Sequence, residues 1–182
     1  GSDGTIAVLR GNLAPEGAVI KHSAVPKKMH HALLRARPFD CEEDAIDAIL
    51  KHRIQPGDAV FIRYEGPRGS GMPEMFYTTE AISSDPELSA SIALITDGRF
   101  SGASKGPAIG HVSPEAAQGG PIALVEEGDL ILIDVKTRKL EIVGVAGEEK
   151  TPEEIDAILK ERKKAWKKRP SRYDSGVLSV YT

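Results

Sequence analysis

Short runs of aliphatic and β-branched residues, each closed by turn-forming residues, recur along the whole chain. Such runs predict β-strands, because branched side chains pack well on a pleated surface while Gly, Pro, Asn and Asp end it. The expected strands cover residues 5–10, 18–25, 58–64, 91–96, 122–125, 129–135 and 140–145. The nearly continuous apolar run within 129–135 favours a strand that is covered on both faces.

Two segments carry the signals of α-helices. Asp40 is placed to cap a helix over residues 41–53, which would end before a Pro-Gly turn. Thr151 and Pro152 open a second helix with a cap, a first-turn proline and early acidic residues. The lysines near its end suit the negative end of the helix dipole better than a nucleic-acid contact. The expected apolar faces hold Ala45, Ile46, Ile49 and Leu50 in the first helix, and Ile155, Ile158, Leu159 and Trp166 in the second.

The chain has 182 residues, and a chain of this length buries roughly 70% of the surface that its unfolded form exposes. No low-complexity linker divides it. We therefore expect a single domain over residues 5–182, with residues 1–4, which begin Gly1-Ser2, left as a tag and linker remnant. Because strands outnumber helices, the expected fold is a β-rich α/β fold, a mixed sheet or barrel flanked by helices.

Charge and composition exclude several classes of function. The 24 basic residues are outnumbered by 27 acidic ones, which argues against a nucleic-acid surface. A single cysteine, Cys41, rules out a disulfide framework and any iron-sulfur or other metal site built only from cysteines of this chain. No run approaches the length of a membrane span and no signal segment opens the sequence, so we expect a cytoplasmic protein with no membrane contact.

Three loops contain more Gly, Pro and small residues than turns require: residues 11–17, 64–75 and 96–107. Glycine allows a backbone to approach a ligand closely, so such loops often hold active sites. General motifs do not fit them. The third loop reads G-x-x-S-G, where a hydrolase elbow needs G-x-S-x-G, and the second lacks the spacing of a dinucleotide or phosphate loop.

The histidines give no strong metal signal. His30 and His31 are adjacent, so their side chains are expected to point in different directions, and a two-histidine metal site there is disfavoured. His22, His52 and His111 stand alone in the sequence, which favours surface or hydrogen-bonded core roles.

Two residues of the glycine-rich loops could carry chemistry. Ser101 would be a poor base by itself, because a serine hydroxyl gives up its proton only in a strong positive field. Glu74 is a hard oxygen donor that suits Mg²⁺ better than zinc. A structural alternative for Glu74 is an N-cap or first-turn acid of a helix running through Phe76, Thr79 and Ile82. The residues alone leave that alternative open.

Five motifs, in this order along nearly the whole chain, resemble the C-terminal domain of the dihydroxy-acid dehydratase and phosphogluconate dehydratase family. They are GNLAPEG at 11–17, the loop at 64–75, TDGRFSG at 96–102, GHVSPEAA at 110–117 and GGPI at 119–122. The resemblance implies a cytosolic enzyme that removes water from 2,3-dihydroxy acids to give 2-keto acids, as in branched-chain amino-acid biosynthesis. It also implies a swivelling β/β/α domain, a mixed β-barrel flanked by helices.

The resemblance further implies an active site shared between two domains. Ser101 matches the serine that, as an alkoxide, takes the C2 proton, and Glu74 matches a glutamate ligand of Mg²⁺. An N-terminal domain would carry the cysteines of an iron-sulfur cluster and most Mg²⁺ ligands, so this chain alone is expected to be inactive. The implied partners are that domain, a small dihydroxy or sugar acid, and further copies of the enzyme in a dimer or larger assembly.

Two departures from the family pattern leave the substrate open. The loop at 66–72 is about one residue shorter than the usual form, which bears on the reach of Glu74. The segment 76–91 also differs from the typical dihydroxy-acid enzyme. A sugar-acid dehydratase therefore remains an alternative, as does a domain that binds an organic acid without catalysis through its glycine-rich loops.

Overall fold

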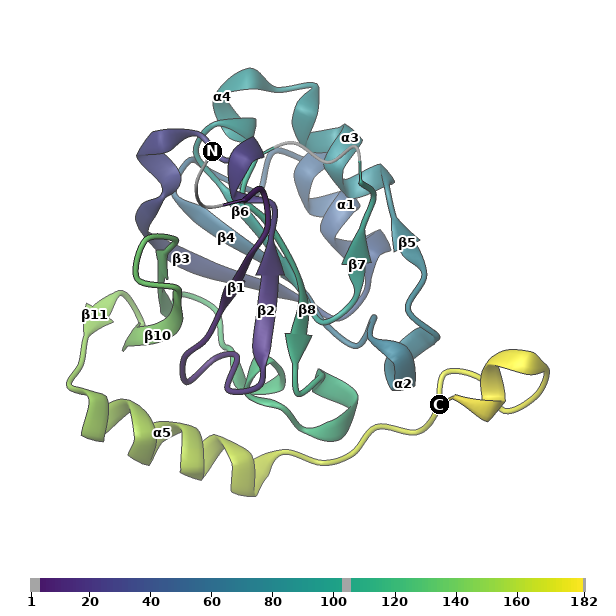
Figure 1. Cartoon of the computed structure of the whole chain (residues 1–182). Helices are drawn as coiled ribbons and strands as arrows, with labels where there is room; N and C mark the ends of the chain where they lie inside the picture. Colours follow the sequence, from purple (N-terminus) through teal and green to yellow (C-terminus); the bar gives the residue numbers. More distant parts are fainter. Residues whose placement is uncertain (1–3, 103–105, 182) are drawn as a thin grey trace.

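The main element of the structure is a nine-stranded mixed sheet that curls strongly, as the computed structural model shows for residues 4–102 and 106–181 (Figure 1). The strand order is β1-β2-β8-β6-β4-β3-β9-β10-β11, with β3, β4, β6 and β8 parallel to one another and the other pairs antiparallel. The strands are β1 (Ala7–Leu9), β2 (Gly17–Ile20), β3 (His31–Phe39), β4 (Asp58–Ile62), β6 (Ala93–Thr96), β8 (Ala108–Ser113), β9 (Leu130–Asp134), β10 (Lys139–Val145) and β11 (Glu148–Glu149). Gly1 and Ser2, interpreted above as a tag remnant, lie outside the described residues.

Two apolar cores lie on the two faces of this sheet. The larger fills the inside of the curl and contains Leu9, Ile20, Phe61 and Ile131. The smaller lies between the parallel strands and α1 (Glu42–Leu50), α3 (Tyr77–Ser83) and α4 (Pro86–Ser89), which cover one face of the sheet (Figure 1). Because strands β4 and β6 are buried on both faces, their sequences are apolar except for Asp58 at the start of β4 and Thr96 at the end of β6.

The two ends of the curled sheet meet at the loop that follows β1. Arg10 donates its backbone N–H to the Arg138 carbonyl at 2.8 Å and accepts from the Leu140 N–H at 2.9 Å. The Asn12 side chain then pairs with both backbone groups of Ile142, at 2.8 and 2.7 Å. These bonds confirm the expected β-rich α/β fold, whose sheet is curled in the manner of a barrel.

One short helix and one longer helix complete the α-helices of the structure. α2 (Pro67–Ser70) lies in the second glycine-rich loop, and α5 (Pro152–Ala165) runs along the bottom of the sheet in Figure 1. Thr151 and Glu154 form the reciprocal capping box that starts α5, which confirms the predicted cap. Single turns of 3-10 helix cover His22–Ala24, Lys27–Met29, Ala116–Gln118, Pro121–Leu124 and Val177–Val180.

The prediction for the first helix is wrong at both ends. Cys41 is the N-cap residue of α1 and makes no side-chain cap bond. The Asp40 carboxylate instead pairs with Arg63 and Arg169, since these two cations compete successfully for it. α1 ends at Leu50, which is 65% exposed rather than part of the apolar face.

The strand predictions fail at several places, and the predicted strand 18–25 already ends at Ile20, before a 3-10 turn over His22–Ala24. Residues 122–125 are not a strand: Pro121 begins a 3-10 turn there, closed by a bond from the Ala123 N–H to the Gly120 carbonyl. A run of four apolar residues cannot by itself distinguish the two structures. Strands β3 and β8 were not expected, because their inward-facing positions include small residues such as Ala32, Ala36 and Gly110.

Candidate active site

Glu74 and Ser101, the two residues singled out from the sequence, lie on adjacent segments of a small second sheet. Strand β5 (Glu74–Met75) pairs in parallel with β7 (Arg99–Phe100), so that Glu74 lies opposite Arg99. The Ser101 N–H extends this pairing by donating to the Met75 carbonyl at 3.4 Å. Glu74 is therefore a strand residue, and the alternative of a helix-capping acid is wrong: Phe76 is the N-cap of α3.

The Glu74 carboxylate is accessible to a ligand. Its side chain is 48% exposed, and its Oε2 lies 3.5 Å from the Arg99 Nη1. Arg99 is held in place by a second bond, from its Nε to the Met72 carbonyl at 3.2 Å. Within residues 4–102 and 106–181, no group of three His, Cys, Asp or Glu side chains could hold a metal ion. Glu74 can thus supply one carboxylate ligand, while further ligands would have to come from elsewhere.

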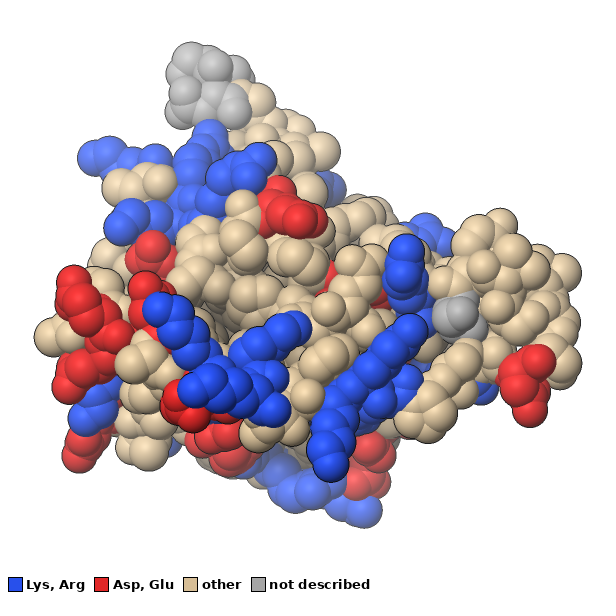
Figure 2. Space-filling view, turned by 90° about the horizontal axis from the view of Figure 1, so that it is seen from below, with Lys and Arg blue, Asp and Glu red and all other residues tan. Residues whose placement is uncertain are grey.

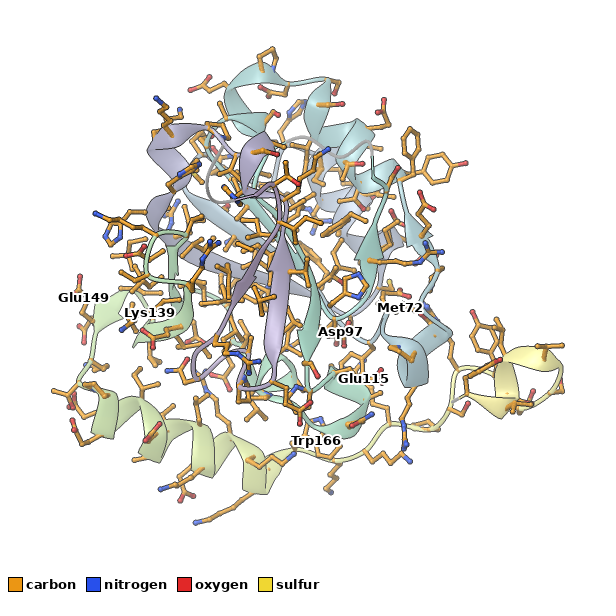
Figure 3. All side chains as sticks on the ribbon, in the orientation of Figure 1. Met72, Asp97, Glu115, Lys139, Glu149 and Trp166 are labelled. Carbon is orange, nitrogen blue, oxygen red and sulfur yellow. The ribbon has the colours of Figure 1, made fainter. Side chains whose placement is uncertain are left out.

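A buried aspartate connects the loop of Ser101 to two other loops. Asp97 accepts the backbone N–H groups of Tyr64 and Glu65, each at 3.1 Å, and that of Ala116 at 2.8 Å. Figure 3 shows Asp97 close to Glu115 in this part of the molecule. Burial raises the pKa of the Asp97 carboxyl to about 6, the three N–H groups counteract this, and the charge of Glu115 adds to it.

Two further buried carboxylates fix the loop that leads to Glu74. Glu115 accepts the backbone N–H groups of Arg68 and Gly69 at 3.0 and 3.1 Å, at the start of α2. Glu65 accepts the Ser70 hydroxyl and an Arg172 guanidinium N–H at 3.1 Å. Sequence reasoning missed Glu65, Asp97 and Glu115. Each of the three is an acidic residue inside one of the five motifs, at a position where a turn alone requires no acid, and this could have indicated their role.

Glycine is required where the third loop crosses the second. A Cβ on Gly98 would lie 2.6 Å from the Glu65 carbonyl oxygen, which is closer than any side chain tolerates. The Gly98 N–H donates to the Thr96 hydroxyl at 2.9 Å, and its carbonyl accepts the His111 N–H at 2.9 Å. This close crossing fixes the chain shortly before Ser101 against β8, the strand that contains His111.

A pocket of about 320 Å³ opens beside Ser101. Most of its wall is apolar or small, while Lys21 and His111 contribute groups that can carry charge. Ser101 itself is half-buried there. The lining residues are Thr5, Ile6, Val19, Lys21, Phe100, Ser101, Gly102, Gly106, Ala108, Gly110 and His111.

The first glycine-rich loop has a structural role instead. A Cβ on Gly11 would collide with the Leu140 carbonyl oxygen, so only glycine allows the strand contact made by Arg10. Asn12 completes the same junction. Residues 103–105 of the third loop lie outside the described part of the chain.

The adjacent histidines diverge, as predicted. His30 Nε2 lies 3.2 Å from the Val25 carbonyl, whereas His31 Nδ1 lies 3.1 Å from Asp134. Of the predicted helix-end lysines, Lys163 donates to the Gly119 carbonyl and lies over the Trp166 ring.

Comparison with known proteins identifies the family. A family model described as the C-terminal domain of dihydroxy-acid/6-phosphogluconate dehydratases matches residues 1–182. The chain belongs to this dehydratase family. The membership confirms the resemblance that the five motifs indicated, and it places the chain in the C-terminal region of such enzymes.

Several relatives of this dehydratase-family chain carry the name dihydroxy-acid dehydratase. The chain is 54% identical over 179 residues to the protein of Agathobacter rectalis, covering 98% of this chain and 30% of that protein. It is 52% identical over 181 residues to that of Syntrophobacter fumaroxidans, covering 99% and 30%, and 51% identical over 189 residues to that of Pyrococcus abyssi, covering 100% and 32%. The chain therefore spans about 30% of the length of these relatives.

Proposed function

We propose that this chain is the C-terminal part of a hydro-lyase that dehydrates a 2,3-dihydroxy acid to a 2-keto acid. The observation that carries the proposal is the placement of Glu74 on β5 next to the segment of Ser101, which lines a pocket, in a chain of the dehydratase family. The names of the relatives favour a dihydroxy acid over a sugar acid as substrate. The corresponding pathway would be branched-chain amino-acid biosynthesis in the cytoplasm.

In this reaction Ser101, as an alkoxide, would take the proton from C2 of the substrate. The hydroxyl on C3 then leaves, and the resulting enol rearranges to the ketone. Ser101 is suited to this role because the crossing of the second and third loops fixes its backbone beside the pocket. Asp97 supports the same crossing by binding both loops.

The residues present fit a shared magnesium site. Glu74 offers a half-exposed carboxylate, the hard oxygen ligand that Mg²⁺ prefers, but it is a single ligand. We propose that the remaining Mg²⁺ ligands, and the cysteines of an iron-sulfur cluster, belong to the part of the enzyme outside this chain. When bound, these groups would supply Lewis-acid chemistry at the oxygens of the substrate.

The face around Glu74 is the proposed docking surface for that other part of the enzyme. Phe76 is 41% exposed and Tyr77 is 71% exposed, directly after Glu74. Large exposed aromatic side chains next to an incomplete site are typical of a surface that a partner covers. The relatives are long enough to supply such a partner domain from the same polypeptide.

We also propose that the whole enzyme forms a dimer or larger assembly. The tip of the segment after α5 forms a lobe that projects from the body, and the surface of this lobe in Figure 2 is mostly uncharged. Val177, Val180 and Tyr181 on this segment are strongly exposed. Sedimentation velocity on the full-length enzyme, compared with a Val180→Asp variant, would show whether this segment joins two copies. The structure describes no helix that is long and apolar enough to cross a membrane.

The test of the activity uses the full-length protein, purified without oxygen and supplied with Mg²⁺. We expect it to form a 2-keto acid from 2,3-dihydroxy-3-methylbutanoate, more efficiently than from an aldonic acid. Ser101→Ala should abolish the product, whereas Ser84→Ala, at an exposed helix end, should not. An enzyme that dehydrates no such acid, or one that tolerates Ser101→Ala, would contradict the proposal.

Calorimetry on the isolated chain tests the alternative of an organic-acid binding domain. A split active site predicts no binding of the dihydroxy acid to this chain alone. Micromolar binding without Mg²⁺ or the rest of the enzyme would favour the binding domain instead.

A further inference from the structure

His111 occupies an irregular position in the middle of strand β8. The pairing of β2 with β8 shifts register there: Gly17 lies opposite Ser113, but Val19 lies opposite Gly110. The extra residue on β8 is a β-bulge, and His111 takes it up with a φ of 57°. Bulges of this kind re-aim a side chain, and they are frequent next to active sites.

The backbone conformation of His111 costs free energy. A left-handed φ is uncommon for residues other than glycine, and it persists only where the surroundings impose it. Here the bond from the His111 N–H to the Gly98 carbonyl imposes it, three residues before Ser101. His111 is exposed at this position and lines the pocket that Ser101 also lines.

Lys21 lines the same pocket. It directly follows strand β2, which pairs with β8. No hydrogen bond or ion pair of its ammonium group is found among the described residues. Lys21 thus places a positive charge in the pocket that Ser101 lines, with no acidic partner among the described residues. A positive charge there favours the alkoxide form of Ser101.

We propose that His111 is a further catalytic residue and that Lys21 is a positioning residue that acts through Ser101, an inference that rests on the proposed function. His111 accepts the hydroxyl proton of Ser101, directly or through one water, so that the O–H bond breaks and an N–H bond forms. The Lys21 ammonium stabilises the resulting alkoxide. The alkoxide then takes the C2 proton of the substrate, and the imidazolium returns its proton to the departing C3 hydroxyl as water forms. Ser101 and His111 end in their starting states.

The variants are chosen to preserve the backbone. Asn accepts a left-handed φ readily, so His111→Asn removes the imidazole without adding strain, and His111→Gly is a second variant with the same property. Lys21→Met removes the charge, while Lys21→Arg keeps it. His31→Asn and Lys28→Met are matched controls, because both residues line a different pocket. Circular dichroism and urea unfolding show whether each variant folds.

Steady-state kinetics on the full-length enzyme with 2,3-dihydroxy-3-methylbutanoate test the inference. We expect kcat to fall roughly a hundredfold in His111→Asn, His111→Gly and Lys21→Met, with little change in KM. The isotope effect of deuterium at C2 should rise in the same variants, which a merely structural role would not cause. Lys21→Arg should recover most of the lost rate, added imidazole should partly restore His111→Gly, and both controls should match the unmodified enzyme.

Two results would overturn the inference, and they are distinguishable. If His111 and Lys21 variants keep full kcat while Ser101→Ala is inactive, this inference fails and the proposed function stands. If the unmodified enzyme dehydrates no 2,3-dihydroxy acid, the proposed function fails and the inference fails with it.

Discussion

Glu74 and Arg99 lie directly opposite each other in the two-stranded parallel sheet, with 3.5 Å between the Glu74 Oε2 and the Arg99 Nη1. Both side chains are about half exposed, so the pair contributes at most about 1 kcal/mol to stability. The main effect of the pair is on geometry, because Arg99 keeps the Glu74 carboxylate beside β7, the strand that leads to Ser101.

The first prediction concerns the metal contact of Glu74. In the full-length enzyme, Glu74→Gln removes a charged oxygen ligand and should raise the Mg²⁺ concentration for half-maximal rate by roughly 10- to 100-fold. Titration of the rate with Mg²⁺ measures this. Glu80→Gln, on the exposed face of α3, is the control and should leave the titration curve in place. An unchanged titration curve for Glu74→Gln would show that Glu74 is not a ligand of Mg²⁺.

The second prediction concerns pH and Asp97. Its pKa is about 6 in the folded chain against a model-compound value of 3.8, so the folded state binds the proton more tightly. Asp97 therefore contributes up to about 3 kcal/mol to the free energy of unfolding below about pH 4. This contribution is lost as the pH rises through about 6. Urea unfolding between these pH values should show the loss, and Asp97→Asn should abolish it. A pH dependence that is the same in the variant would assign the effect to other groups.

The third prediction concerns the junction that closes the curled sheet. Asn12→Ala leaves both backbone groups of Ile142 without a partner and should lower the free energy of unfolding by about 1–3 kcal/mol per unsatisfied group. Asn12→Asp retains the acceptor for the Ile142 N–H but loses the donor to the Ile142 carbonyl. Its stability should therefore lie between those of the unmodified chain and Asn12→Ala. Urea unfolding of the chain provides the measurement. Equal stability of all three proteins would show that water replaces the amide at no cost.

The fourth prediction concerns the attachment of α5. Arg162 makes two bonds to the fully buried Asp129, at 2.6 and 2.9 Å, and a third to the Leu124 carbonyl. Arg162→Met leaves the Asp129 charge buried and unpaired, which should cost about 3–5 kcal/mol. The control is Lys164→Met, whose exposed pair with Glu161 should be worth less than about 1 kcal/mol. Thermal unfolding of the two variants should therefore differ clearly, and similar values would contradict the assignment.

The fifth prediction concerns the reactivity of Cys41. Burial raises the pKa of its thiol to about 11; the backbone N–H of Asp44 counteracts this, while the side chains of Asp44 and Glu43 add to it. Because only the thiolate reacts, alkylation by iodoacetamide at pH 8 should be at least about tenfold slower in the folded chain than in urea. Mass spectrometry follows the labelling with time. A rate that does not change on unfolding would show that the thiol is not shielded.

Some elements could be predicted because their signals are local. The capping box of α5 involves Thr151 and Glu154, three residues apart, and strand β9 is apolar from Leu130 to Ile133. The resemblance to the dehydratase family rests on motifs that are continuous in the sequence. Ser101 and Glu74 were therefore accessible as candidates, and the structure adds that they lie on adjacent segments of the chain, Glu74 on β5 and Ser101 directly after β7.

Other features could not be predicted because distant residues determine them. Asp40 was expected to cap α1, but Arg63 and Arg169 take its carboxylate in the folded chain. Asp97 is distinctive only once the N–H groups of Tyr64 and Ala116 converge on it. His111 stands alone in the sequence, and its importance emerges from the register shift between β2 and β8.

The contact between Arg172 and Glu65 gives the last turns of the described chain an influence on the site. Glu65 is buried, and besides Arg172 its carboxylate accepts the Ser70 hydroxyl at the end of α2 and, at 3.4 Å, the Glu42 N–H. A protease that cut after Lys168 would release the guanidinium and leave a negative charge enclosed in the protein. The segment between α2 and Glu74 would then have to open to water, so a cut near residue 168 would loosen the Glu74 carboxylate that we propose as a magnesium ligand.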